Sequence, residues 1–145
     1  MLYKKILRNG SLILAAMVTP ILLGNPTKVE THQKLLNAIC TVESNCNDDA
    51  VGLVGEIGSY QIRWCNWKDA TDFDPTIGGT YQDCKDSEYS KQIVLAYWSR
   101  YAIINRVGKI VTDEDRARIH NGGPNGYKKD CTKIYWDKIK NELLH

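Results

Sequence analysis

Residues 38–46 read AICTVESNC, residues 55–62 read GEIGSYQI, and the rest of the chain is interpreted around these two stretches. In a helix, four apolar side chains of the first stretch and the residues before it fall on one face, which predicts burial against a core. They are Leu35, Leu36, Ile39 and Cys40. Glu43 lies four residues after Ile39 and therefore continues this face. A carboxyl group in such a place loses hydration, which favours the protonated form that a general acid needs.

The second stretch is rich in glycine. Gly52, Gly55 and Gly58 recur every third residue, a spacing that favours a turning loop over a strand or a helix. We expect Ser59 to be the N-cap of a second helix that ends near Ala70. A loop and a helix start opposite a half-buried acid would form a cleft with polar and aromatic walls.

Two blocks of the chain resemble known families. Glu43-Ser44, residues 50–52 (AVG) and residues 58–62 (GSYQI) resemble the superfamily of soluble lytic transglycosylases and goose-type lysozymes. Residues 117–126 (ARIHNGGPNG) are similar to the signature of invertebrate-type lysozymes. The resemblance covers about residues 34 to 140. It implies a mainly α, lysozyme-like α+β fold with at most a small sheet.

The resemblance implies that Glu43 is the general acid of a glycosidase, and the second carboxylate stays open. Invertebrate-type lysozymes carry an aspartate where the ungapped position of this chain is Val51. Glu56 in the glycine loop is our candidate, with Asp48 or Asp49 as alternatives if the loop folds back. Each alternative has a structural reading: Glu56 could order its loop, and the two aspartates could be a solvated turn.

Substrate-binding roles follow from the resemblance as well. The residues concerned are Ser44, Gly58, Tyr60, Gln61, His120 and Asn121. Ser44 would donate a hydrogen bond to the sugar N-acetyl group or to Glu43, and Gly58 would let the glycan approach the backbone. Tyr60 and Gln61 would line the cleft, and Asn121 would close its far wall. His120 stands where transglycosylases have a tyrosine, and a hydrogen-bonded core histidine is the alternative reading.

The whole chain is consistent with one small domain. Its 145 residues support a single core of about five to six helices, and a net charge of +2 gives no reason to expect nucleic-acid binding. We expect helices from Thr31 to about Ser44, from Asp86 or Ser87 onward, from Thr112 to about His120, and from about Thr132 to Leu143. The helix that starts at Asp86 or Ser87 carries an apolar stripe and should be the central strut. Its members are Ile93, Val94, Tyr97, Trp98, Tyr101 and Ile104. Residues 71–85 should be a long polar loop.

The first 27 residues are set apart from this domain. Three basic residues within residues 1–9 precede an apolar run at residues 11–23, which is typical of a signal peptide and short for a membrane span. We therefore assign residues 1–27 to a signal peptide or an uncleaved N-terminal membrane anchor, and residues 28–145 to the catalytic domain. The protein is expected to be secreted, periplasmic or extracellular, with membrane contact only through a retained N-terminal segment.

Five cysteines fall in the presumed mature part, and an exported protein is expected to form disulfides. We expect Cys65 to pair with Cys84, and Cys40 or Cys46 to pair with Cys131. One of the five must stay free or bond another chain. The cysteines form no C-x-x-C pair and the three histidines are far apart in sequence, so we expect no metal site. No organic cofactor is implied either.

The leading hypothesis is an exported enzyme that cleaves the β-1,4 bond between N-acetylmuramic acid and N-acetylglucosamine in peptidoglycan glycan strands. A lysozyme would use water. A lytic transglycosylase would use Glu43 as acid and then base, and form a 1,6-anhydro product. Chitin is a possible substrate, since it carries the same N-acetyl groups. A non-catalytic glycan-binding or interaction protein is the alternative, and a protease acting through Ser44 lacks an evident base.

Overall fold

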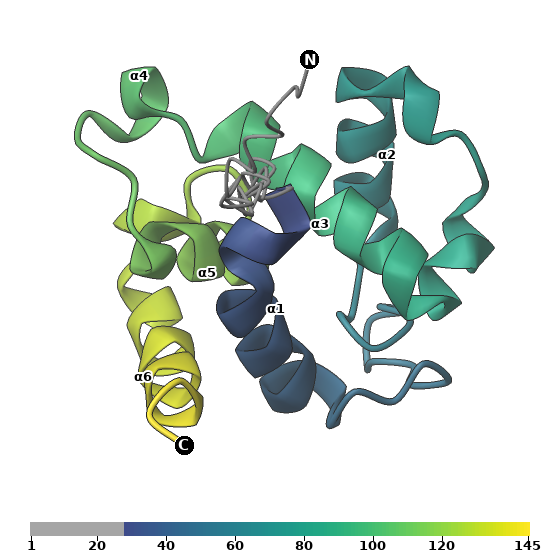
Figure 1. Ribbon diagram of the computed structural model, residues 1–145, viewed down its shortest axis with the longest axis horizontal. Coiled ribbons are helices and arrows are strands. Elements are labelled where there is room, and N and C mark those ends of the chain that lie inside the picture. The colour runs from purple at the N-terminus through teal and green to yellow at the C-terminus, as the bar shows by residue number, and fades with distance from the viewer. Residues whose placement is uncertain (1–27) are drawn as a thin grey trace, which may run out of the picture.

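The computed structural model describes residues 28–145, which form a bundle of helices. The expected signal peptide or anchor at residues 1–27 lies outside the described residues. The described residues contain six α-helices, and the colours of Figure 1 follow them in chain order. They are α1 (Lys28–Ser44), α2 (Trp64–Phe73), α3 (Ser87–Tyr101), α4 (Ile104–Val107), α5 (Asp113–Gly122) and α6 (Lys133–Glu142). Four short 3-10 helices connect them: η1 (Pro75–Ile77), η2 (Tyr81–Lys85), η3 (Gly126–Lys128) and η4 (Asp130–Thr132).

A mainly α fold is confirmed. From residue 28 onward the chain has no β-strand, and its β-structure is limited to two isolated bridges, Val51 with Ile57 and Ile57 with Ile62. None of the helices in this part of the chain is long and apolar enough to cross a lipid bilayer.

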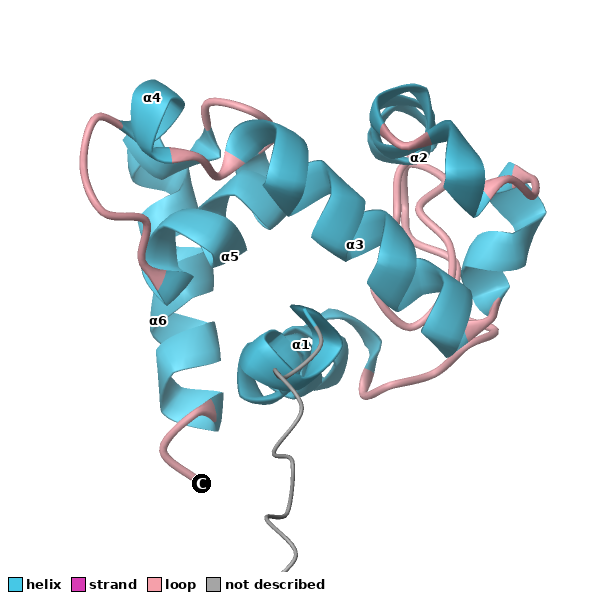
Figure 2. Cartoon of the chain, turned by 45° about the horizontal axis from the view of Figure 1, so that its top comes forward, coloured by secondary structure: helices cyan, strands magenta, loops and turns pink. Residues whose placement is uncertain are grey.

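Helix α3 crosses the middle of the molecule, with α2 on one side and α4 and α5 on the other (Figure 2). It packs against α1, α2 and α5. Most of the apolar stripe predicted for it is buried, since Ile93, Val94, Tyr97 and Trp98 are at most 3% exposed. The last two members differ: Tyr101 is only partly buried at the end of α3, and Ile104 starts the short helix α4 with 60% of its surface exposed.

Helix α1 buries the face that the sequence predicts. Leu36 and Ile39 are fully buried, and Leu35 and Cys40 are nearly so. The helix ends at Ser44 because Asn45 and Cys46 both take a left-handed backbone conformation, with φ of 55° each. This turn brings Cys46 back toward Cys40, and the two form a disulfide with Cα atoms 4.8 Å apart.

The predicted disulfide pairs are therefore wrong. Cys40 and Cys46 bond each other, so neither is available to Cys131, which is a free and exposed thiol. Cys65 is free and exposed near the start of α2, whereas Cys84 is free and fully buried. Burial raises the pKa of the Cys84 thiol to about 12, so this thiol stays protonated in the core.

The second helix starts later than predicted. Ser59 is buried in a turn and does not cap a helix; α2 begins at Trp64. Gln61 has a φ of 47°, and Ile62 exchanges two backbone hydrogen bonds with Ile57, so residues 57–62 form a tight hairpin-like turn. The region predicted to be loop is also more regular than expected, because α2 runs to Phe73 and η1 and η2 follow.

Two helix starts agree with the sequence. The Asp86 side chain accepts a hydrogen bond from the backbone N–H of Tyr89 at the start of α3. Thr112 and Asp115 form a reciprocal capping box at the start of α5.

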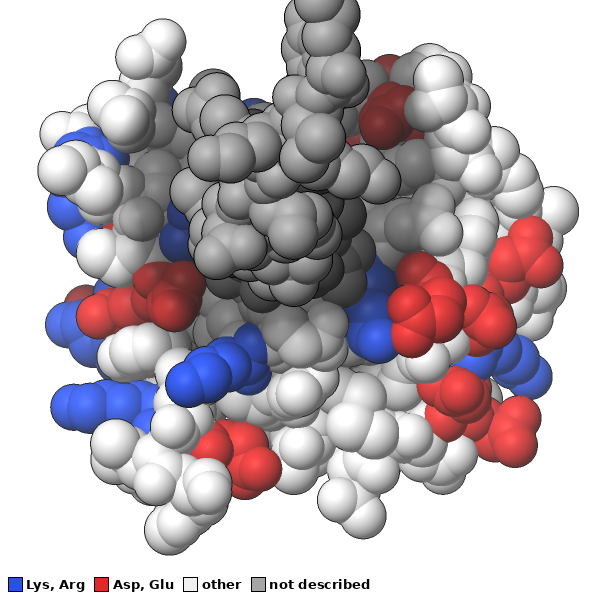
Figure 3. All heavy atoms as spheres, viewed as in Figure 1, with Lys and Arg blue, Asp and Glu red and all other residues white. Residues whose placement is uncertain are grey.

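On the face shown in Figure 3, the visible basic and acidic side chains are interspersed and do not form a large patch of one sign.

Candidate active site

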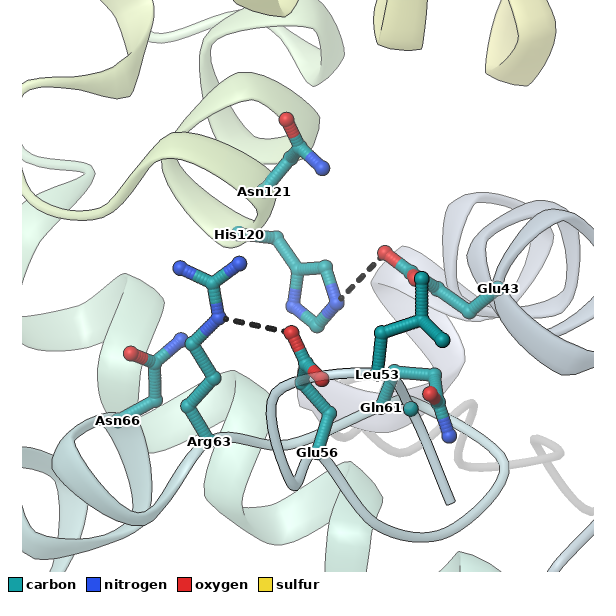
Figure 4. Close-up of a pocket in the computed structure, with 9 residues that line it drawn as sticks. Glu43, Leu53, Glu56, Gln61, Arg63, Asn66, His120 and Asn121 are labelled. Atoms are coloured by element: carbon teal, nitrogen blue, oxygen red, sulfur yellow. Dashed lines mark hydrogen bonds and ion pairs between the residues drawn. The ribbon is translucent and has the colours of Figure 1, made fainter. Parts of the chain in front are cut away.

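A pocket of about 250 Å³ lies where the end of α1, the glycine loop, the start of α2 and the end of α5 meet. Figure 4 shows how its side chains converge from these four segments. The lining residues are Glu43, Gly52, Leu53, Glu56, Gln61, Arg63, Asn66, His120 and Asn121. Four of the residues predicted from the sequence to form the site are thus brought together with Glu43, although they are up to 78 positions apart in the chain.

Glu43 lies in the last turn of α1 with 17% of its side chain exposed. One carboxylate oxygen is 3.5 Å from Nε2 of His120, which α5 presents from the other side of the pocket (Figure 4). The carboxyl group is thus largely removed from water yet open to the pocket. This is the placement that a group transferring a proton to a bound substrate requires.

Glu56 lies in the glycine loop with 14% of its side chain exposed. Desolvation by itself raises the pKa of this carboxyl group. Hydrogen bonds from the backbone N–H groups of Glu56 and Val54 and the nearby Arg63 guanidinium outweigh desolvation, so the net pKa is lowered. Arg63 Nε is 3.2 Å from Oε1, and the Val54 N–H donates to Oε2 over 3.2 Å. Glu56 is therefore held as an ionised carboxylate facing the pocket that Glu43 also faces.

His120 is 7% exposed, and its Nε2 lies 3.1 Å from the carbonyl oxygen of Tyr60. A carbonyl oxygen only accepts hydrogen bonds, so this contact places the proton on Nε2. The same nitrogen faces Glu43. The sequence left two interpretations of His120 open, a hydrogen-bonded core histidine and a residue of the site. In the structure His120 is both buried and part of the pocket wall.

Gln61 lines the pocket, and its amide is largely committed to the loop. Its Nε2 donates to the carbonyl oxygens of Gly58 over 2.9 Å and of Ala50 over 3.3 Å. A side chain added at Gly52 would collide with Oε2 of Glu56 and Oε1 of Gln61, at 2.4 Å and 2.6 Å. Gly52 thus leaves the space in which these two side chains meet.

Three residues predicted to bind substrate do not line the pocket. The Ser44 hydroxyl donates to the carbonyl oxygen of Ser59 and accepts from the Asn47 N–H, so it ties the end of α1 to the loop. The Tyr60 side chain is 1% exposed in the core, and only its carbonyl oxygen reaches the site, through His120. Gly58 has a φ of 77°, and a Cβ there would come within 1.9 Å of the Cys84 carbonyl oxygen. Gly58 therefore allows close packing of the protein backbone.

The alternative second carboxylates are also placed away from the pocket. Asp48 and Asp49 are exposed in the turn after α1, and the Asp49 N–H donates to the Asn47 side chain. They match the solvated-turn reading. Trp67 donates its indole N–H to the Tyr89 hydroxyl and is a packing residue, while Trp64, next to Arg63 in sequence, is 58% exposed.

Sequence reasoning missed several pocket residues. Leu53, Arg63 and Asn66 line the pocket, but nothing in their local pattern separates them from ordinary loop and helix residues.

Comparison with known proteins agrees with this geometry. The family model described as Destabilase matches residues 32–142. A lysozyme of Meretrix lusoria is 34% identical over 114 residues, which cover 74% of this chain and 87% of that protein. Lysozyme 1 of Crassostrea virginica is also 34% identical over 114 residues, but the match spans only 58% of its length. Invertebrate-type lysozyme 6 of Caenorhabditis elegans is 34% identical over 115 residues, 72% of this chain and 82% of that protein.

Solved structures lead to the same family. The Meretrix lusoria lysozyme, crystallised in complex with Aeromonas hydrophila PliI, superposes with a TM-score of 0.65 at 30% identity. The superposition covers 75% of this chain and 88% of that chain. The Tapes japonica lysozyme gives a TM-score of 0.63 at 29% identity over 74% of this chain and 87% of that one. The chain thus belongs to the Destabilase family, the invertebrate-type lysozymes, and is a glycosidase of the lysozyme type.

Proposed function

We propose that this protein hydrolyses the β-1,4 bond between N-acetylmuramic acid and N-acetylglucosamine in peptidoglycan, with Glu43 as general acid and Glu56 as the second carboxylate. One observation carries the proposal: both carboxylates line one pocket, and the pKa of Glu56 is lowered. Glycosidic cleavage needs one carboxyl group that donates a proton and a second that stays ionised near the developing positive charge. Family membership supports the same reaction class.

In this proposal the different environments of Glu43 and Glu56 give the two carboxyl groups different roles. Glu43 reaches the pocket from the buried face of α1 and would protonate the leaving glycosidic oxygen. Glu56, kept ionised by Val54 and Arg63, would stabilise or capture the oxocarbenium-like centre, or activate the attacking water. Asn66 and Asn121 offer amide groups at the wall of the same pocket, and Gln61 offers its amide oxygen, groups suited to the hydroxyl and N-acetyl groups of the sugars.

A transglycosylase that forms 1,6-anhydro ends is the second route, since the spacing from Glu43 to Gln61 matches that family. The lowered pKa of Glu56 favours hydrolysis, because the transglycosylase route needs no ionised second carboxylate. The peptidoglycan substrate also implies that the protein acts outside the cell that makes it.

The test is mass spectrometry of the soluble products released from purified peptidoglycan. Reducing-end products are expected from the wild type. Glu43→Gln should lower the rate about a thousandfold, and Glu56→Gln about a hundredfold, the ranges typical of losing a general acid and an electrostatic stabiliser. Glu88→Gln is the matched control, because Glu88 lies in α3 with 72% of its side chain exposed and should leave the rate unchanged.

Other products would change the assignment. Anhydro products with an active Glu56→Gln variant would establish the transglycosylase route with Glu43 alone. Cleavage of chitin but not of peptidoglycan would replace the substrate. Binding of peptidoglycan without any product would refute the catalytic proposal in favour of a glycan-binding protein.

A further inference from the structure

Arg63 directly precedes helix α2 and lines the pocket. In the described part of the chain it is the only lysine or arginine in the pocket wall. Its Nε lies 3.2 Å from Oε1 of Glu56, and 53% of its side chain is exposed. The Glu56 carboxylate thus holds in place a positive group that a bound ligand can still reach.

Most of the hydrogen-bonding capacity of Arg63 is unused. A guanidinium group carries five N–H donors in a rigid planar fork. Glu56 accepts from one of them, and within residues 28–145 the other four make no hydrogen bond. Figure 4 shows the two terminal nitrogens pointing away from Glu56. The acceptor that best matches two parallel N–H groups is a carboxylate or a phosphate.

The place of Arg63 relative to the reaction follows from its bond to Glu56. In the proposed function, Glu56 lies beside the oxocarbenium-like centre, which develops at the anomeric carbon of N-acetylmuramic acid. Arg63 is therefore on the muramic-acid side of the bond that breaks. This sugar differs from N-acetylglucosamine in one substituent, a lactyl ether that ends in a carboxyl group. The carboxyl group is ionised in peptide-free strands, and it is amide-linked where a stem peptide is attached.

The remaining titratable groups of the pocket do not attract an anion. Glu43 and Glu56 both face the pocket, and the lowered pKa of Glu56 keeps this second carboxylate ionised. The Nε2 proton of His120 is directed at the Tyr60 carbonyl oxygen and at Glu43. A substrate carboxylate would be repelled here unless a cation compensated for the two acidic groups. Arg63 supplies this cation, and a neutral polymer such as chitin has no use for it.

We propose that Arg63 is a specificity-determining residue: its terminal amino groups bind a substrate carboxylate on the muramic-acid side of the cleaved bond. This inference rests on the proposed function, and it gives the enzyme a reason to prefer peptidoglycan strands to chitin. The interaction is charge-assisted and has two parallel hydrogen bonds, but the side chain is half exposed. We therefore expect it to improve affinity about tenfold.

The test is an NMR titration of the full-length protein with three probes. The first is the disaccharide of N-acetylglucosamine linked to N-acetylmuramic acid in that order, which lacks the bond to be cleaved and stays intact. The second is its lactyl methylamide, which has nearly the same shape without the charge. The third carries a dipeptide on the lactyl group, with one free carboxylate on the dipeptide. At neutral pH the wild type should bind the first probe about tenfold more tightly than the second, and high salt should reduce this preference.

Three variants identify the group responsible. Arg63→Gln should lose the preference and bind the methylamide as the wild type does. Arg63→Lys keeps the charge without the planar fork and should retain part of the preference. Arg116→Gln is the control, because Arg116 pairs with Asp113 over 3.2 Å outside the pocket, and it should keep the full preference. An Arg63 that only orders Glu56 would instead weaken both probes equally when it is replaced.

The probes also separate the two sources of a carboxylate. A preference for the first probe that Arg63→Gln abolishes identifies the lactyl group of peptide-free strands. A preference for the third probe over the methylamide, abolished by the same variant, identifies the stem peptide. Equal affinities of the wild type for all three probes would overturn the proposal.

This titration is independent of catalysis, so the two proposals can fail separately. A fully active Glu43→Gln variant would refute the proposed function, and the ratio of affinities would still show whether Arg63 binds a carboxylate. An inactive Glu43→Gln variant together with equal affinities for the three probes would refute the role of Arg63 alone.

Discussion

Glu43 and Glu56 are two carboxyl groups of the same type that lie in different surroundings, and the proposed mechanism gives them different tasks. Glu43 faces a histidine nitrogen, whereas Glu56 is bound by backbone N–H groups and an arginine. Both residues are glutamates, so the difference between them comes from their neighbours and not from the residue type. Separating the behaviour of two carboxyl groups by environment is a common way to obtain an acid and an ionised partner in one site.

At the scale of single residues, replacing Arg63 should change how the activity depends on pH. The pKa of Glu56 is lowered, so the ionised form that the proposed mechanism needs is present above that pKa and is lost as the pH falls through it. Arg63→Gln removes one cause of the lowering and should raise the pKa of Glu56. The acidic limb of the kcat/KM profile should therefore move to higher pH, with little change at the alkaline end.

Arg116→Gln is the control for this shift. Arg116 also pairs with a carboxylate over 3.2 Å, that of Asp113, but it does not line the pocket. The acidic limb of the kcat/KM profile of Arg116→Gln should coincide with that of the wild type. An unshifted limb in Arg63→Gln would mean that Glu56 does not titrate in the rate-determining state.

At the scale of elements, helix α5 positions His120 and Asn121, and its first turn is fixed by a capping box. Thr112 donates its hydroxyl to Asp115 Oδ2 over 2.8 Å, and its backbone N–H donates to the same oxygen over 3.0 Å. Lys109 Nζ is also 3.0 Å from this carboxylate. The turn after α5 is equally constrained, because a Cβ at Gly126 would come within 1.8 Å of the Arg118 carbonyl oxygen.

Removal of this cap should lower stability. Thr112→Ala is expected to lower the free energy of unfolding by about 1 kcal/mol, the usual value of an N-cap. Urea denaturation at neutral pH measures it. Thr41→Ala is the control, since Thr41 lies inside α1, and alanine favours a helix interior. Equal losses in the two variants would contradict a specific role of the cap.

The same cap makes stability depend on pH. Desolvation opposes ionisation of Asp115, but hydrogen bonds from Thr112 and Lys109 outweigh it and lower its pKa. The stabilisation is therefore present above the pKa of an unfolded aspartate and is lost as the pH falls through the folded pKa. The difference in unfolding free energy between wild type and Thr112→Ala should accordingly shrink in acid.

At the scale of the whole molecule, the arrangement of the helices determines the state of each cysteine. Native alkylation followed by peptide mapping should modify Cys65 and Cys131, which are exposed, and spare Cys84, which is buried. Denaturation without reduction should add Cys84, while Cys40 and Cys46 react only after reduction. A peptide linking Cys65 to Cys84, the pair expected from the sequence, would refute this thiol map.

The sequence by itself determined the features that depend on neighbours three or four residues apart. The buried faces of α1 and α3, the Asp86 and Thr112 caps, and the mainly α class all follow from helical periodicity and capping chemistry. The motif around Glu43 also identified the reaction class, because a family pattern keeps its spacing along the chain.

Only the tertiary structure decided which distant groups meet. Gln61 takes a positive φ and Gly58 packs on the Cys84 carbonyl oxygen, so residues 58–62 form a turn instead of the predicted helix start. Cys46 turns back to Cys40 rather than reaching Cys131. Arg63 binds Glu56, and His120 of α5 reaches Glu43 of α1, through contacts across loops and helices. Such contacts are fixed by how the whole chain packs, and no local pattern of residues encodes them.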